Sequence, residues 1–94
     1  MTTLRADKLS TGAIACTVTH HESSMIWRHT ISDALTENKT YARWDVNPDI
    51  EIRLRCIDGG VVVETHHRRT GEVYQVSPSP GHYQFTPATK RPPR

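Results

Sequence analysis

The chain has 94 residues, 35% of them hydrophobic, and a formal net charge of +2 from twelve basic and ten acidic side chains. This length fits one small domain, and the balanced charge argues against binding of nucleic acid through the overall field of the molecule. The sequence shows no apolar stretch long enough to span a membrane and no secretory signal, so we predict a cytoplasmic protein.

The first twenty residues divide into a polar lead-in and a strand. Residues 1–11 are polar and mixed in character, which predicts an N-terminal arm without regular structure. Residues 12–20 alternate, with Ile14, Cys16 and Val18 on one side, and this pattern predicts the first strand. Cys16 and Cys56 both fall on inward faces of predicted strands, so in a reducing cytosol we expect two buried free thiols.

Residues 21–37 permit two interpretations. As a helix from about Ser24, the segment places these side chains on one stripe: Trp27, Thr30, Ile31, Ala34 and Leu35. As a strand, alternate side chains share a face, after a turn at 21–24 and before a short helix beginning at Ser32; these are Met25, Trp27, His29 and Ile31. Trp, His and Thr are only fair helix formers, which keeps the strand interpretation open, but we predict the helix.

Residues 40–76 carry the clearest strand patterns. Thr40 to Val46 predicts a strand that ends at an Asn-Pro-Asp turn. Residues 50–76 then predict a three-stranded antiparallel meander. An Asp58-Gly59 loop pairs Cys56 with Val61 and Arg53 with Glu64, whereas a loop one residue later keeps the same faces but pairs Arg55 with Glu64. A second turn near Thr70-Gly71 returns the chain with Tyr74 and Val76 on the inner face.

The remaining residues complete the predicted domain. Pro and Ser interrupt regular structure at 77–81, a short edge strand is expected at 82–85, and residues 87–94 form a basic, Pro-rich tail that we predict to be disordered. The sum is a single α+β domain over residues 12–86, with an antiparallel sheet of about five strands in the order β-α-β-β-β-β and one helix on one face. A small all-β barrel or sandwich is the alternative.

No motif in the sequence indicates catalysis or metal binding. The six histidines lack the Cys-x-x-Cys or His-x₃-His spacing that structural zinc sites require. There is no Gly-rich phosphate loop and no nucleophile elbow, and a cysteine buried in a strand is normally inert. We therefore predict a protein that is not an enzyme, with no catalytic residues, no cofactor and no bound metal.

The outward side of the predicted sheet is the candidate binding surface. Arg and aromatic side chains are common anchors in protein interfaces, and these residues are predicted to share this side: Tyr41, Arg43, Arg53, Arg55, Glu64, His66 and Arg68. We predict a small binding module of the inhibitor or adaptor type, the size of a phage- or plasmid-borne accessory protein, with a protein as its partner. Nucleic-acid binding by the same side and the basic tail is the alternative. A thin core and strong strands also fit a homodimer.

Overall fold

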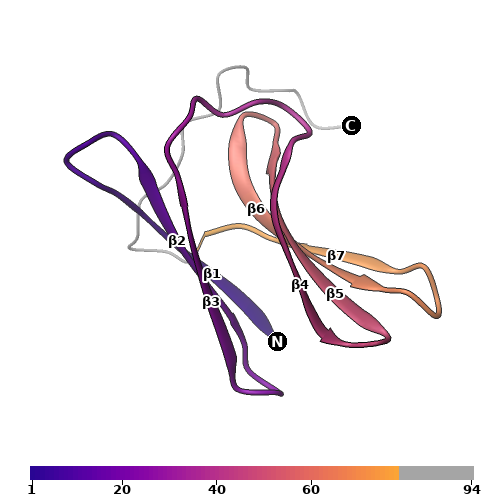
Figure 1. The fold of residues 1–94 in the computed structure, drawn as a ribbon. Helices are drawn as coiled ribbons and strands as arrows, with labels where there is room; N and C mark the ends of the chain where they lie inside the picture. Colours follow the sequence, from indigo (N-terminus) through magenta and orange to yellow (C-terminus); the bar gives the residue numbers. More distant parts are fainter. Residues whose placement is uncertain (79–94) are drawn as a thin grey trace.

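The computed structural model describes residues 1–78 as seven antiparallel strands in two sheets (Figure 1). The three-stranded sheet contains β1 (Thr2–Lys8), β2 (Ile14–His20) and β3 (Met25–Ile31). The four-stranded sheet contains β4 (Thr40–Asn47), β5 (Ile50–Ile57), β6 (Gly60–His67) and β7 (Val73–Val76). Strands that follow one another along the chain are neighbours in each sheet, so each sheet is a meander. In this part of the chain there is no helix that is long and apolar enough to cross a membrane.

A single core lies between the two sheets. The buried side chains come from both layers: Leu4, Ala6, Ile14, Cys16, Val18 and Ile31 from one sheet, and Ile52, Leu54, Val61 and Val63 from the other. Trp27 on β3 stacks on Trp44 on β4, with ring centroids 5.5 Å apart and planes inclined by 13°. Because each sheet buries one face against the other, the described chain is a two-layer β-sandwich.

The predicted α+β fold is wrong, because the expected helix is a strand. Residues 25–31 form β3, which pairs with β2 over its whole length, from Ile14 opposite Ile31 to His20 opposite Met25. A tight turn at 21–24 joins the two strands, and Ser24 adopts a φ of 60° in it. Within β3, Trp27 and Ile31 lie on the side of the strand that faces the core. The burial of this side against the second sheet stabilises the strand more than the helical spacing of the apolar residues could stabilise a helix. Residues 32–39 then cross to the second sheet without forming the short helix of the strand interpretation.

The predicted N-terminal arm is also wrong. Residues 2–8 form β1, where Leu4 and Ala6 are fully buried. The alternating pattern is weak here because Leu4 is the only large apolar residue on the inner side. The outer edge of β1 meets the end of the described chain, where Leu4 and Pro78 form an isolated parallel bridge.

The structure confirms the predicted strands that lie within residues 12–76 and the predicted register of β5 against β6. β5 and β6 pair with Cys56 opposite Val61 and Arg53 opposite Glu64, as a two-residue Asp58-Gly59 loop requires. Asp58 and Gly59 have φ values of 56° and 77°, which a type I′ turn demands. β2, β4 and β7 also lie where strands were predicted. The expected edge strand at 82–85 and the tail at 87–94 lie outside the described residues. The two cysteines, Cys16 and Cys56, are buried and free.

Candidate partner-binding face

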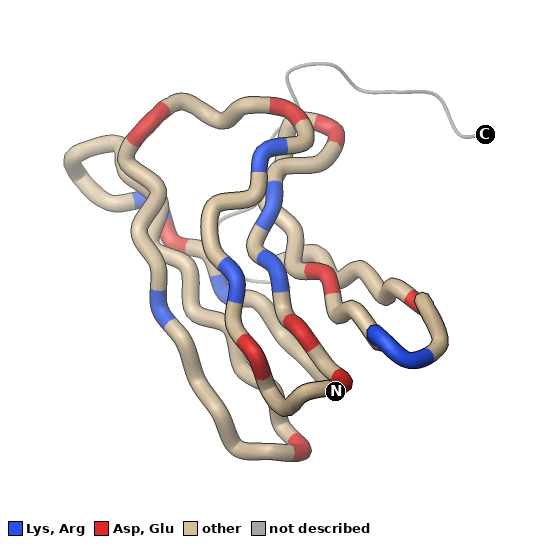
Figure 2. The backbone as a smooth tube through the Cα atoms, turned by 45° about the vertical axis from the view of Figure 1, so that its right-hand side comes forward, with Lys and Arg blue, Asp and Glu red and all other residues tan. Residues whose placement is uncertain are grey.

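The outward side of the four-stranded sheet gathers most of the predicted binding residues. Figure 2 shows basic and acidic positions interspersed along its neighbouring strands. We call this surface the polar face, and it consists of Arg43, Asp45, Glu51, Arg53, Arg55, Glu64, His66 and Arg68. Six of the seven predicted binding residues belong to it, because the side chains of paired strands alternate between faces in step.

Tyr41 does not belong to the polar face, so its predicted outward orientation is wrong. The register of β4 against β5 shifts between Thr40 and Ala42, which leaves Tyr41 without a partner across the ladder. The extra residue turns the Tyr41 ring toward the core, where its hydroxyl accepts a hydrogen bond of 2.9 Å from the backbone N–H of Thr36. Bulges of this kind re-aim a side chain without a reliable signal in the sequence.

Arg55 and Glu64 form the upper part of the polar face. Arg55 donates to Thr40 Oγ1 at 3.1 Å, to Glu64 Oε2 at 3.1 Å and to the backbone carbonyl of Asn38 at 2.8 Å. The second oxygen of Glu64 lies 2.8 Å from Nε2 of His66. Every strong donor of this cluster therefore has an acceptor within the chain, and Glu64 is buried beneath its partners.

Glu51 is the centre of the lower part. Its Oε1 accepts from Nε of Arg53 at 2.5 Å, and its Oε2 lies 3.3 Å from Nη2 of Arg68, which also bonds to Asp45 at 2.6 Å. The hydrogen bond from Arg53, together with the positive charges of Arg53, Arg68 and Arg43, lowers the pKa of the Glu51 carboxyl, although burial acts in the opposite direction. Glu51 thus forms ion pairs with Arg53 and Arg68, and the charge of Arg43 acts on it without an ion pair.

Arg43 is the one arginine of the polar face that forms no ion pair within residues 1–78. It stands directly opposite Arg53 in the β4–β5 ladder. Its side chain is exposed, and within residues 1–78 it makes no ion pair with a carboxylate. Like charges directly opposite each other destabilise a sheet, so this pair is a local cost in the folded chain. The sequence alone did not reveal the pair, because the register of β4 depends on its two bulges.

The described residues also bear on the requirements of metal sites and reactive thiols. Across the described part of the chain, no group of three or more His, Cys, Asp or Glu side chains is placed to hold a metal ion. Burial, with a smaller contribution from Asp7, raises the pKa of the Cys16 thiol to about 12, so this side chain is not a thiolate at neutral pH. The polar face presents ordered guanidinium groups and one excess positive charge.

Comparison with known proteins gave no match to a family model, to a curated protein or to a solved structure.

Proposed function

We propose that the protein is a small non-enzymatic module, of the inhibitor or adaptor type, that binds a partner protein through the polar face. The cross-strand pair of Arg43 and Arg53 carries this proposal. Glu51, on which the charge of Arg43 also acts, forms its ion pairs with Arg53 and Arg68. A carboxylate of the partner, placed against Arg43, would offset the repulsion between the two guanidinium groups and would complete the charge pattern of the face.

The composition of the polar face favours a protein over a nucleic acid. Asp45, Glu51 and Glu64 lie among its arginines, and these carboxylates repel a phosphate backbone. Single-stranded nucleic acids also need aromatic side chains on which bases stack. Tyr41, the one aromatic residue predicted for this face, packs toward the core instead. The arginines that remain are suited to the carboxylates of an acidic protein surface.

The test is capture of a partner from host lysate with four forms of the tagged chain. The first is the wild type, and the second is the double variant Arg43→Ala/Arg53→Ala. The matched control is Arg5→Ala/Arg28→Ala, which removes the same charge from the outer side of the three-stranded sheet. The fourth form is wild type treated with nuclease. Circular dichroism verifies that each variant keeps the β-sheet fold.

We expect to capture a discrete protein that is still captured after nuclease treatment and that also binds the Arg5→Ala/Arg28→Ala control. This protein should bind the Arg43→Ala/Arg53→Ala variant at least about tenfold more weakly, which corresponds to a loss of ~1.4 kcal/mol of binding free energy. Equal capture by both double variants would show that the polar face is not the binding surface. Loss of all captured material on nuclease treatment, with a steep decrease of affinity in salt, would assign the face to nucleic acid instead.

A further inference from the structure

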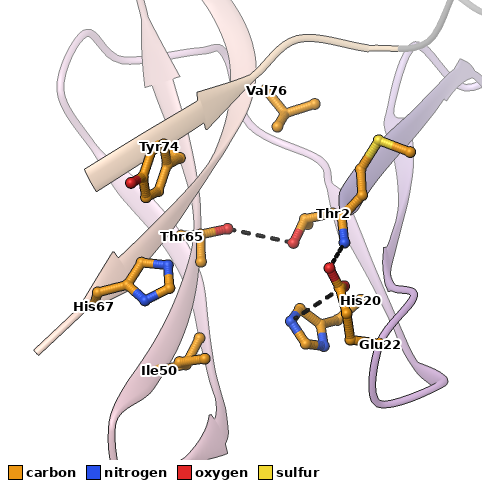
Figure 3. Close-up of a pocket in the computed structure, with 9 residues that line it drawn as sticks. Thr2, His20, Glu22, Ile50, Thr65, His67, Tyr74 and Val76 are labelled. Carbon is orange, nitrogen blue, oxygen red and sulfur yellow. Dashed lines mark hydrogen bonds and ion pairs between the residues drawn. The ribbon is translucent and has the colours of Figure 1, made fainter. Parts of the chain in front are cut away.

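A cavity of about 380 Å³ opens between the two sheets at one end of the sandwich. Figure 3 shows its two walls: His20 and Glu22 face inward from the three-stranded side, and Ile50, Tyr74 and Val76 from the four-stranded side. Its volume is within the range of about 300–1,000 Å³ that small-molecule sites occupy. The cavity lies on the inner side of the four-stranded sheet and is thus separate from the polar face.

The hydrogen bonds of His20 determine which ring nitrogen carries its proton. The side chain is only 8% exposed, and its Nδ1 lies 2.7 Å from Oγ of Ser23. The Ser23 hydroxyl donates its single proton to the backbone carbonyl of His20 at 3.3 Å. With the hydroxyl proton on this carbonyl, Ser23 Oγ accepts from Nδ1–H, and in this tautomer Nε2 of the neutral ring is an acceptor.

This acceptor stands beside a second one. Nε2 of His20 lies 3.7 Å from Oε1 of Glu22, and no residue between 1 and 78 places a hydrogen-bond donor on Nε2. The other carboxylate oxygen of Glu22 is paired with the amino group of Met1. Two neighbouring acceptors, one of them charged, are best satisfied by a donor that carries positive charge and more than one N–H.

The opposite wall of the cavity combines apolar side chains with Thr65 and His67 of β6. Ile50, Val76 and the ring of Tyr74 line it, and Tyr74 is held edge-on by His67 with ring centroids 5.4 Å apart. The Tyr74 hydroxyl bonds to Glu72, outside the cavity lining, so the ring itself is the part available for contact. A ligand that fills the cavity needs an apolar or aromatic body on this side.

We propose that the cavity binds a small primary amine, with its ammonium group bonded to His20 Nε2 and Glu22 Oε1 and its apolar body against Ile50, Tyr74 and Val76. The ammonium has three donors, enough to serve both acceptors at once. The neutral state of His20 is part of the site, since a protonated ring would repel the ligand. Binding at this site does not depend on the polar face or on its partner.

The environment of His20 keeps the ring neutral near pH 7. Burial lowers the pKa of His20, and the positive charges of the amino terminus, His21 and His67 add to this effect. Glu22 is the carboxylate that faces the ring, and His67 is the titratable group that faces it from β6. Acidification protonates His20 and strengthens its pairing with Glu22, so the amine is displaced as the pH decreases.

The probe for the test is phenethylamine, and its matched control is 3-phenylpropionate, a similar body with a carboxylate in place of the amine. We expect phenethylamine to shift the NMR signals of the cavity residues and of the His20 ring nitrogens at pH 7.5, and to bind more weakly as the pH is lowered through the pKa of His20. Glu22→Gln should weaken binding by about tenfold, the effect expected for one charge-assisted hydrogen bond. Asp33→Asn, an exposed carboxylate after the far end of β3, should bind as the wild type does.

Three results would overturn the proposal: no shifts at the cavity residues with phenethylamine, equal binding of 3-phenylpropionate, or equal binding by Glu22→Gln and Asp33→Asn. Because Glu22 is an exposed turn residue, its replacement is not expected to unfold the chain. The backbone spectrum of each variant verifies this. A variant that binds no partner protein but still binds phenethylamine separates this proposal from the function of the polar face.

Discussion

The paired basic side chains of the polar face share two carboxylate acceptors, Glu51 and Glu64. Glu51 accepts from Arg53 and lies beside Arg68, while Glu64 accepts from Arg55 and lies beside His66. Both carboxylates are less than one-tenth exposed, Glu51 at 8% and Glu64 at 7%. Ion pairs at such positions gain more from geometry than exposed pairs do, but removal of one partner leaves a buried charge uncompensated.

Glu51 provides a pH-dependent contribution to stability. Its pKa is lowered from the ordinary value of 4.5 by the hydrogen bond and charge of Arg53 and by Arg68. A carboxyl with a depressed folded-state pKa stabilises the fold above its unfolded-state pKa, and this contribution is lost as the pH falls through the folded-state value. We therefore expect Glu51→Gln to lower the free energy of unfolding by about 1 kcal/mol at pH 7 and by almost nothing below the folded-state pKa.

Urea unfolding over a pH series from 7 downward measures this effect, with the exposed Asp33→Asn variant as the control at each value. A Glu51→Gln deficit that does not decrease anywhere in the series would contradict the assignment, because the lost interaction would then not depend on the carboxylate charge.

At the scale of strands, local patterns determined pairing well where one face is buried. The alternation of β5 and the Asp58-Gly59 turn were enough to place Arg53 opposite Glu64, since a shift of one residue would reverse the faces. The same logic could not place β1, whose inner side offers only Leu4 as a large apolar residue. It failed for β3 because a helical stripe and a strand alternation overlap in that segment. Only contact with a second sheet decides between them, and that contact is not a local property.

The face on which each candidate binding residue lies was also predicted correctly where its strand alternates regularly and incorrectly where it does not. The sequence placed Arg53, Arg55, Glu64 and His66 on one face because their strands alternate regularly. It misplaced Tyr41, where a bulge adds a residue to β4, and it missed the Arg43–Arg53 pair for the same reason. Bulges depend on the fit between two strands and their surroundings, so alternation within one strand does not reveal them.

The β6–β7 turn supplies a test of backbone conformation alone. Gly71 has a φ of 77°, and a Cβ at this position would meet nothing within 4 Å. Any loss of stability caused by a side chain at position 71 therefore comes from the strained backbone conformation and not from a clash with neighbouring atoms. We expect Gly71→Ala to destabilise the fold by about 1 kcal/mol and Gly71→Asn by less, because Asn tolerates the left-handed region. Urea unfolding would refute this if both variants matched the wild type.

For the molecule as a whole, one core joins two sheets. Leu54 of the four-stranded sheet and Val18 of the three-stranded sheet are both fully buried in the same cluster. Neither meander has a second apolar layer of its own within the described residues, so each depends on the other for burial. The two sheets should therefore unfold together in one cooperative transition.

Replacement of Leu54 tests this dependence. We expect Leu54→Ala to lower the free energy of unfolding by about 2–5 kcal/mol, the range for deletion of a fully buried leucine side chain. Leu9→Ala, at a leucine that is 42% exposed, should change it by less than about 0.5 kcal/mol. Tryptophan fluorescence and far-UV circular dichroism should report the same midpoint for each variant. Separate transitions would show that the sheets are independent units.

The bridge between Leu4 and Pro78 has a consequence for the order in which the protein is made. β1 is synthesised first, yet its inner face is covered only after residues 50–63 have followed, and its outer edge meets Pro78 later still. During synthesis, the apolar side of the three-stranded sheet therefore stays exposed until the four-stranded sheet has been made. We therefore expect productive folding to wait until nearly all of the described chain has emerged, with apolar surface of the first sheet exposed until then.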